Sequence, residues 1–126
     1  MCNTSCNECC NKVFSSTITV ETVNGVSTLV VNVPDQTFSN CQRGCLVLVQ
    51  PIPATATVEM PVAITIGDGT AYYPVNTCGG TPVVVPMLRT RRRYPFKVVT
   101  NTTSGSFTIL KNLSCYTVNN LATIGG

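Results

Sequence analysis

The sequence contains no histidine and no tryptophan, and only 10% of its 126 residues are charged. Without histidine, the commonest general base and the commonest metal ligand are missing, and Ser-His and Cys-His nucleophile pairs are excluded. The five carboxylates lie far apart in the chain, and no Gly-rich phosphate-binding motif is present. We therefore expect a protein that is not an enzyme and that needs no cofactor, with a zinc ion as the one alternative considered below.

Long apolar runs are also missing. The runs at Leu46–Val49 and Val83–Val85 have the length of strands and are too short to cross a bilayer. Met1 is followed by cysteine and polar residues rather than by a basic and then an apolar segment, so no secretory signal is predicted. We expect a protein that is made in a cytoplasm and has no membrane partner.

The shortage of charge points to a covered surface, because about a quarter of the residues in soluble domains are usually charged. We expect copies of the chain or a larger assembly to cover it; a Thr/Asn/Ser-rich surface that stays soluble is the alternative. All five acidic residues precede residue 69, whereas six of the eight basic residues follow it. This asymmetry favours head-to-tail contact between copies or contact with an acidic partner.

Threonine (19 residues) and valine (18 residues) dominate the composition, as expected for tightly packed strands. The clearest element is residues 17–33, where two β-branched runs flank Asn24-Gly25, the dipeptide best suited to a tight hairpin turn. Turn signals recur about every 8–12 residues. We predict an all-β fold, a single antiparallel β-sandwich of jelly-roll or immunoglobulin-like type with about eight or nine short strands.

The remaining elements follow from the same pattern. Hairpins are predicted over residues 61–75, around a three-residue loop at Gly67-Asp68-Gly69, and over residues 96–110. Shorter strand-like runs cover residues 57–60, 82–86 and 115–118. We divide the chain into a Cys-rich N-terminal arm, residues 1–14, and a β-sandwich domain, residues 15–126.

The eight cysteines are unevenly placed, and four of them lie in the arm. A polar arm dense in cysteine is well suited to reaching a neighbouring subunit, so the candidates for inter-subunit disulfides are Cys2, Cys6, Cys9 and Cys10. The spacing also has the ligand count of a tetrahedral zinc site formed by Cys6, Cys9, Cys41 and Cys45. A third interpretation is that the cysteines outside the arm are small buried apolar residues.

Residues 89–97 form a basic segment with interleaved aromatic residues. Arginine binds carboxylates through forked hydrogen bonds, so we expect this segment to bind an acidic protein surface. A solvated loop and nucleic-acid binding are the less favoured alternatives, since one basic stripe falls short of the usual nucleic-acid footprint. Strand alternation would place Arg89, Arg91 and Arg93 on one face. The predicted partner-binding residues are Arg89, Arg91, Arg92, Arg93, Tyr94 and Lys97.

Several motifs taken together resemble those of a known group of proteins. They are the Cys-rich start, the Cys41–Cys45 loop, Ile52-Pro53-Ala-Thr, Pro61-Val-Ala-Ile-Thr-Ile-Gly67, Tyr73-Pro74 and Arg89-Thr-Arg-Arg-Arg-Tyr94. The chain resembles small β proteins of gut bacteria and their tailed phages, some of which are virion or head auxiliary proteins. The resemblance implies a structural protein of the virion that decorates and reinforces the capsid lattice.

A second resemblance rests on Cys9-Cys10. Bacterial endospore appendage subunits, which are jelly rolls without a signal, also have a Cys-Cys-containing N-terminal connector that links stacked copies. This resemblance implies the alternative function, a self-assembling extracellular fibre subunit on a spore or cell surface, cross-linked through its arm.

Overall fold

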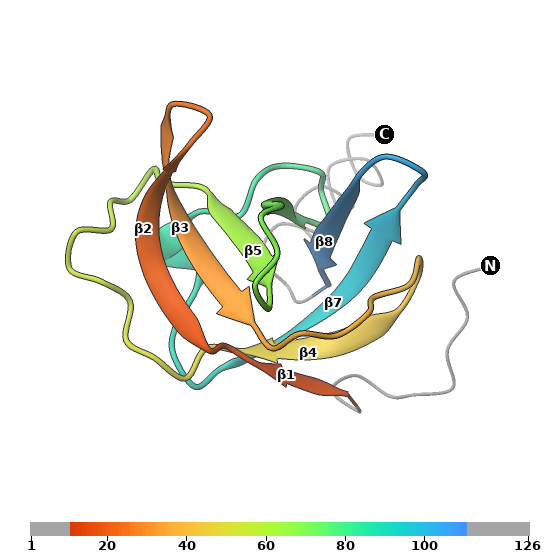
Figure 1. Cartoon of the computed structure of the whole chain (residues 1–126). Coiled ribbons are helices and arrows are strands. Elements are labelled where there is room, and N and C mark those ends of the chain that lie inside the picture. The colour runs from red at the N-terminus through yellow and green to blue at the C-terminus, as the bar shows by residue number, and fades with distance from the viewer. Residues whose placement is uncertain (1–10, 111–126) are drawn as a thin grey trace, which may run out of the picture.

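The computed structural model describes residues 11–110, which form one strongly curled β-sheet (Figure 1). This part of the chain has eight strands, one short 3-10 helix and no α-helix. The elements, in chain order, are β1 (Lys12–Phe14), β2 (Thr17–Val23), β3 (Val26–Val33), β4 (Arg43–Val47), β5 (Val62–Ile66), β6 (Tyr73–Thr77), η1 (Val85–Met87), β7 (Arg93–Thr100) and β8 (Gly105–Ile109).

The strands follow the order β1-β4-β7-β8-β6-β5-β3-β2 across the sheet. Neighbours pair antiparallel in β2–β3, β4–β7, β5–β6 and β7–β8, and parallel in β1–β4, β3–β5 and β6–β8. The all-β class is confirmed, whereas the predicted sandwich or jelly roll is not. The parallel pairs join strands that are far apart in sequence, and residue alternation carries no information on the direction of such pairs.

The hairpin at residues 17–33 is confirmed as β2 and β3. Asn24 and Gly25 have φ angles of 51° and 80°, both in the left-handed region that this turn requires. The hairpin at residues 96–110 is confirmed as β7 and β8. β5 and β6 also pair antiparallel, but residues 67–72 connect them, a longer loop than the predicted three residues.

Two predicted strands are wrong. Residues 57–60 form a turn in which the Met60 N–H donates to the Thr57 carbonyl at 3.3 Å. Residues 82–86 contain isolated bridges and the start of η1, because prolines at both ends lack the N–H that a ladder needs. Residues 115–118 lie outside the described part of the chain. Lys12–Phe14, placed in the arm by the sequence, form β1.

The two outermost strands of the sheet, β1 and β2, are consecutive in the chain and are joined by Ser15 and Ser16 (Figure 1). The Ser15 N–H donates to the Val47 carbonyl at 3.0 Å, and the Ser16 N–H donates to the Asn32 carbonyl at 2.7 Å. Gln50 secures this junction, because its amide nitrogen donates to both serine carbonyls at 2.9 Å and its carbonyl accepts from the Ser15 hydroxyl. Each serine therefore extends the ladder of its own strand, Ser15 toward β4 and Ser16 toward β3, and Gln50 holds the link between them.

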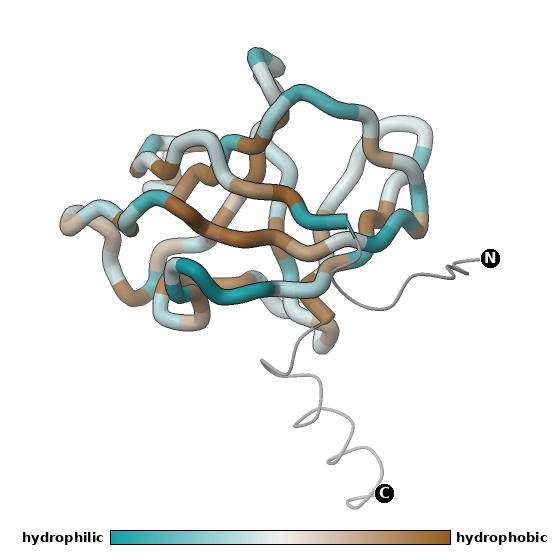
Figure 2. Tube along the Cα trace, turned by 90° about the horizontal axis from the view of Figure 1, so that it is seen from below, coloured by the Kyte–Doolittle hydropathy of each residue, from teal (hydrophilic) through white to brown (hydrophobic). Residues whose placement is uncertain are grey.

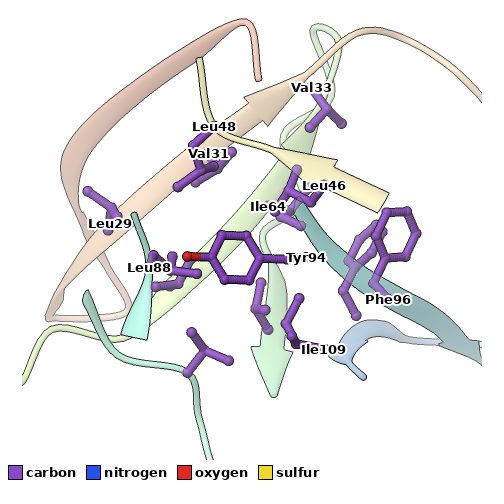
Figure 3. Packing of buried hydrophobic residues seen from close by; sticks show 14 of the residues in the cluster. Leu29, Val31, Val33, Leu46, Leu48, Ile64, Leu88, Tyr94, Phe96 and Ile109 are labelled. Carbon is purple, nitrogen blue, oxygen red and sulfur yellow. The ribbon is translucent and has the colours of Figure 1, made fainter. Parts of the chain in front are cut away.

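Hydrophobic and hydrophilic stretches alternate along the chain (Figure 2), and the buried hydrophobic residues come mainly from the strands. The curled sheet buries its inner face as a single core, in which Tyr94 lies among aliphatic side chains from several strands (Figure 3). Phe107 makes edge-to-face contacts with Phe38 and Phe96, with ring centroids 5.2 and 5.4 Å apart. Parts of the outer face are buried as well, among them Val30, Cys45 and Ala63, so only its exposed residues are candidates for contact with a partner.

A candidate docking surface

The basic segment is a turn followed by a strand. Residues 89–92 precede β7, which begins at Arg93, and Arg91 has a φ of 65°. The Arg91 N–H donates to the Leu48 carbonyl at 2.7 Å, so the turn is attached to the end of β4. The predicted strand alternation of the arginines is therefore wrong before Arg93. All four arginines are exposed, as a docking role requires.

Tyr94 was predicted to contact the partner, and this prediction is wrong. Its side chain is only 2% exposed and belongs to the core (Figure 3). The Tyr94 hydroxyl accepts a hydrogen bond of 2.7 Å from the Arg89 N–H. Strand alternation explains the error, because Tyr94 follows the exposed Arg93 at the start of β7 and so points to the opposite face. Its role is to hold the basic turn.

The strand register brings further cations onto the outer face beside the segment. Arg43 on β4 lies directly opposite Lys97 on β7. Residues directly opposite in an antiparallel pair have Cβ atoms about 5 Å apart on the same face, and like charges there are destabilising. Arg43 is exposed and Lys97 is half-buried. The chain thus places two positive charges side by side where an uncharged pair would stabilise the sheet better.

Exposed side chains on the same side of the sheet also come from β1, although Cys45 and Val47 between them are buried. Lys12 lies opposite Cys45 in the parallel β1–β4 pair, two residues from Arg43 along β4. Phe14 lies opposite Val47, and Val47 lies opposite Arg93, so the three form one row across the strands. Phe14 is 49% exposed. We call this face the basic surface and define it by Lys12, Phe14, Arg43, Arg93 and Lys97.

No acidic side chain of the described part of the chain neutralises the basic surface. None of its four cations forms an ion pair within residues 11–110. Glu21 is engaged elsewhere, since its two oxygens accept from Tyr72 and Thr19 at 2.8 Å. Arg93 and Lys97 are four residues apart on one strand, which spaces them by about 13 Å. The arrangement offers several separated cations and one exposed aromatic ring to a partner.

The predicted cysteine sites fall only partly within the described residues. Cys2, Cys6, Cys9 and Cys10 lie outside them, so the inter-subunit disulfides stay a prediction. Cys41, Cys45 and Cys78 are disulfide-bonded. In this oxidised state Cys41 and Cys45 are not thiolates, so the predicted zinc site with Cys6 and Cys9 applies only to a reduced protein. Within residues 11–110, no three His, Cys, Asp or Glu residues gather as a metal site.

Sequence reasoning missed Lys12, Phe14 and Arg43. All three occur well before residue 89, and only the pairing of β1 with β4 and of β4 with β7 brings them beside Arg93 and Lys97. Strand alternation could have indicated that each points outward. It could not have indicated that β1 exists or which strands are its neighbours.

Comparisons with known proteins add no constraint on this site. No protein-family model, no curated protein and no solved structure matches the chain. In the part of the chain that the structure describes, no helix has the length and apolar character needed to span a membrane.

Proposed function

We propose that this protein is a non-enzymatic structural subunit that binds an acidic protein surface of a larger assembly through its basic surface. The observation that carries the proposal is the direct pairing of Arg43 with Lys97 without any carboxylate beside them. A pair of like charges opposite each other weakens an isolated sheet, and functional sites are where such local rules are broken. An acidic partner would turn this repulsion into attraction.

Phe14 supports a protein partner rather than nucleic acid. An exposed aromatic side chain among cations is typical of an interface anchor, because aromatic residues and arginine are enriched at the energetic centres of protein interfaces. Its row neighbours, Val47 and Arg93, provide an apolar base and a forked donor. Nucleic-acid binding stays the less favoured alternative.

We propose a phage capsid as this assembly and the virion as the location of the protein. The low charge of the chain and its resemblance to head auxiliary proteins support this choice. The fold would then act as a decoration protein that lies on the capsid lattice and reinforces it. We include in this proposal that the curled sheet is a variant of a β-sandwich.

The proposal is tested on virions and with one matched pair of variants. Mass spectrometry of purified virions should detect the chain, and purified chain should cosediment with capsids that lack it. Arg43→Gln with Lys97→Gln removes two charges and should weaken cosedimentation by about tenfold or more, as expected for interface hot spots. Thr55→Glu with Val58→Glu changes net charge equally in the β4–β5 connection and should leave it unchanged.

Other outcomes would contradict the proposal. They are absence of the chain from virions, equal cosedimentation of both double variants, or steeply salt-dependent binding to DNA without binding to capsids. Long filaments of the purified chain in negative-stain images would favour the fibre subunit instead.

A further inference from the structure

A second surface feature lies beyond the basic surface on the outer face of the sheet. The rows of the sheet continue from Lys97 to Val99 on β7, and Val99 lies opposite Ser106 on β8. Here the β7–β8 turn, residues 101–104, and the residues that precede β6 enclose a groove of about 530 Å³. No residue that lines the groove is charged.

An exposed aromatic ring whose hydroxyl is held by a hydrogen bond lines the groove. Tyr72 is 40% exposed, and its hydroxyl donates to Glu21 at 2.8 Å. Glu21 is itself held by the Thr19 hydroxyl, also at 2.8 Å. The hydrogen bond from Tyr72 to the Glu21 carboxylate, with its negative charge, raises the pKa of Tyr72, so the phenol stays neutral. A tyrosine held in this way contributes apolar contact area at little cost in conformational entropy.

The lining also includes polar groups that have no partner within the described residues. The Asn101 side-chain oxygen accepts from the N–H groups of Thr103 and Ser104 at 2.9 Å, which orders the turn. Its amide nitrogen, the Asn76 amide and the Ser106 hydroxyl donate no hydrogen bond in residues 11–110. All three residues line the groove. The groove therefore combines two amides and a hydroxyl with an aromatic ring, which is the composition of a site for a polar uncharged ligand.

We propose that this groove binds a neutral carbohydrate. A pyranose ring has an apolar C–H face that would lie against the Tyr72 ring, and hydroxyl groups that would pair with the amides of Asn76 and Asn101 and with Ser106. Amides and hydroxyls can both donate and accept, which matches a ligand made of hydroxyl groups. The uncharged lining gives an anionic or cationic ligand no ion pair.

An extended peptide fits the groove less well. The groove lies over β6, β8 and β7, each of which already has a hydrogen-bonded neighbour on both sides. A peptide could not add a strand there, since strand addition needs an unpaired sheet edge.

The test uses the full chain and a panel of neutral oligosaccharides, namely gluco-, galacto-, manno- and N-acetylglucosamine trisaccharides, with sialylated and sulfated glycans as charged comparators. Saturation-transfer NMR and titration should detect binding of at least one neutral member. Tyr72→Ala should weaken it by about tenfold, and Asn76→Ala by a smaller factor, in line with aromatic anchors dominating a site. Val58→Ala, a change at a 70% exposed residue outside the groove, should have no effect.

Three results would overturn the proposal. The first is that the protein binds none of the neutral oligosaccharides. The second is that the Tyr72→Ala variant binds them as tightly as the wild type. The third is that the protein binds only the charged glycans and loses this binding in the Arg43→Gln, Lys97→Gln variant, which would assign the ligand to the basic surface. If Tyr72→Ala lowers the melting temperature, Ser106→Trp serves as the test variant instead. Its large side chain would fill the groove and should abolish binding. Capsid cosedimentation does not depend on any of these results.

Discussion

On the inner face of the β4–β7 ladder, Gly44 lies opposite Phe96 and Leu46 lies opposite Tyr94, whereas on the outer face Arg43 lies opposite Lys97. The inner pairs complement each other in size: a Cβ on Gly44 would lie 2.7 Å from Cζ of Phe96. The outer pair shares a sign and has no carboxylate of the described residues nearby. The inner pairs complement each other within the chain, whereas the outer pair places two like charges opposite each other.

The largest effect is expected from breaking the inner face. Phe96→Ala should destabilise the protein by about 3–5 kcal/mol, because it removes a fully buried ring and leaves a cavity. Urea denaturation followed by fluorescence or circular dichroism measures the change. Phe14→Ala, on the outer face, is the matched control and should cost little stability while weakening capsid cosedimentation. Similar destabilisation by both changes would contradict the distinction between the two faces.

The β2–β3 turn tests a position where the chain satisfies its own backbone. Gly25 has a φ of 80°, and no atom lies within 4 Å of the position that a Cβ would take, so the cost of a side chain comes from the backbone alone. Gly25→Val should destabilise the protein by about 1–2 kcal/mol. Gly25→Asn should cost much less, because asparagine tolerates the left-handed region. Equal melting temperatures for the valine variant and the wild type would rule out the conformational argument.

The outer face should respond in the opposite direction. Arg43→Gln with Lys97→Gln should raise the free energy of unfolding by a few tenths of a kcal/mol, since it removes a like-charge pair. The gain should shrink in high salt, which screens exposed charges. A stability gain combined with lost capsid binding is the expected signature of a surface that trades stability for binding. A loss of stability at low salt would show that the two cations are not in repulsion.

The smallest effect concerns Tyr72. Glu21 raises its pKa above the ordinary 10.0, so the hydrogen bond contributes stability that is complete below about pH 10 and is lost as the pH rises through the folded-state pKa. Absorbance at alkaline pH should show this phenol ionising later than in Glu21→Gln. Tyr72→Phe should remove the corresponding slope in stability. An unchanged titration in Glu21→Gln would argue against a fixed ring and weaken the case for the groove.

Much of the fold could be predicted from local patterns. The Asn24-Gly25 turn, the alternation in β2 and β3 and the β7–β8 hairpin are encoded within short stretches, and the structure confirms them. The parallel pairs could not be predicted, because their strands meet through long connections that leave no mark on residue alternation. For the same reason the sequence suggested a sandwich rather than one curled sheet.

The sequence predicted only part of the candidate site. The run of arginines stood out, but its orientation depends on the positive φ of Arg91 and on the hydrogen bond to Leu48, which no spacing rule reveals. Tyr94 looked like a surface aromatic because its neighbours are charged, yet it lies in the core. Arg43 and Lys97 are 54 positions apart, so their repulsion exists only in the folded protein.

The junction at Ser15 and Ser16 has a consequence for the order in which the chain can fold. The ribosome makes β1 and β2 first, and β2 can pair with β3 almost at once. β1 pairs with β4. The other neighbour of β4 is β7, which is made only when nearly all of the described chain has been synthesised. Such distant pairings slow folding, because the loops must close before the contacts form. We therefore expect β1 to pair stably only after synthesis has passed β8, with the Ser15–Gln50 contacts among the last to form.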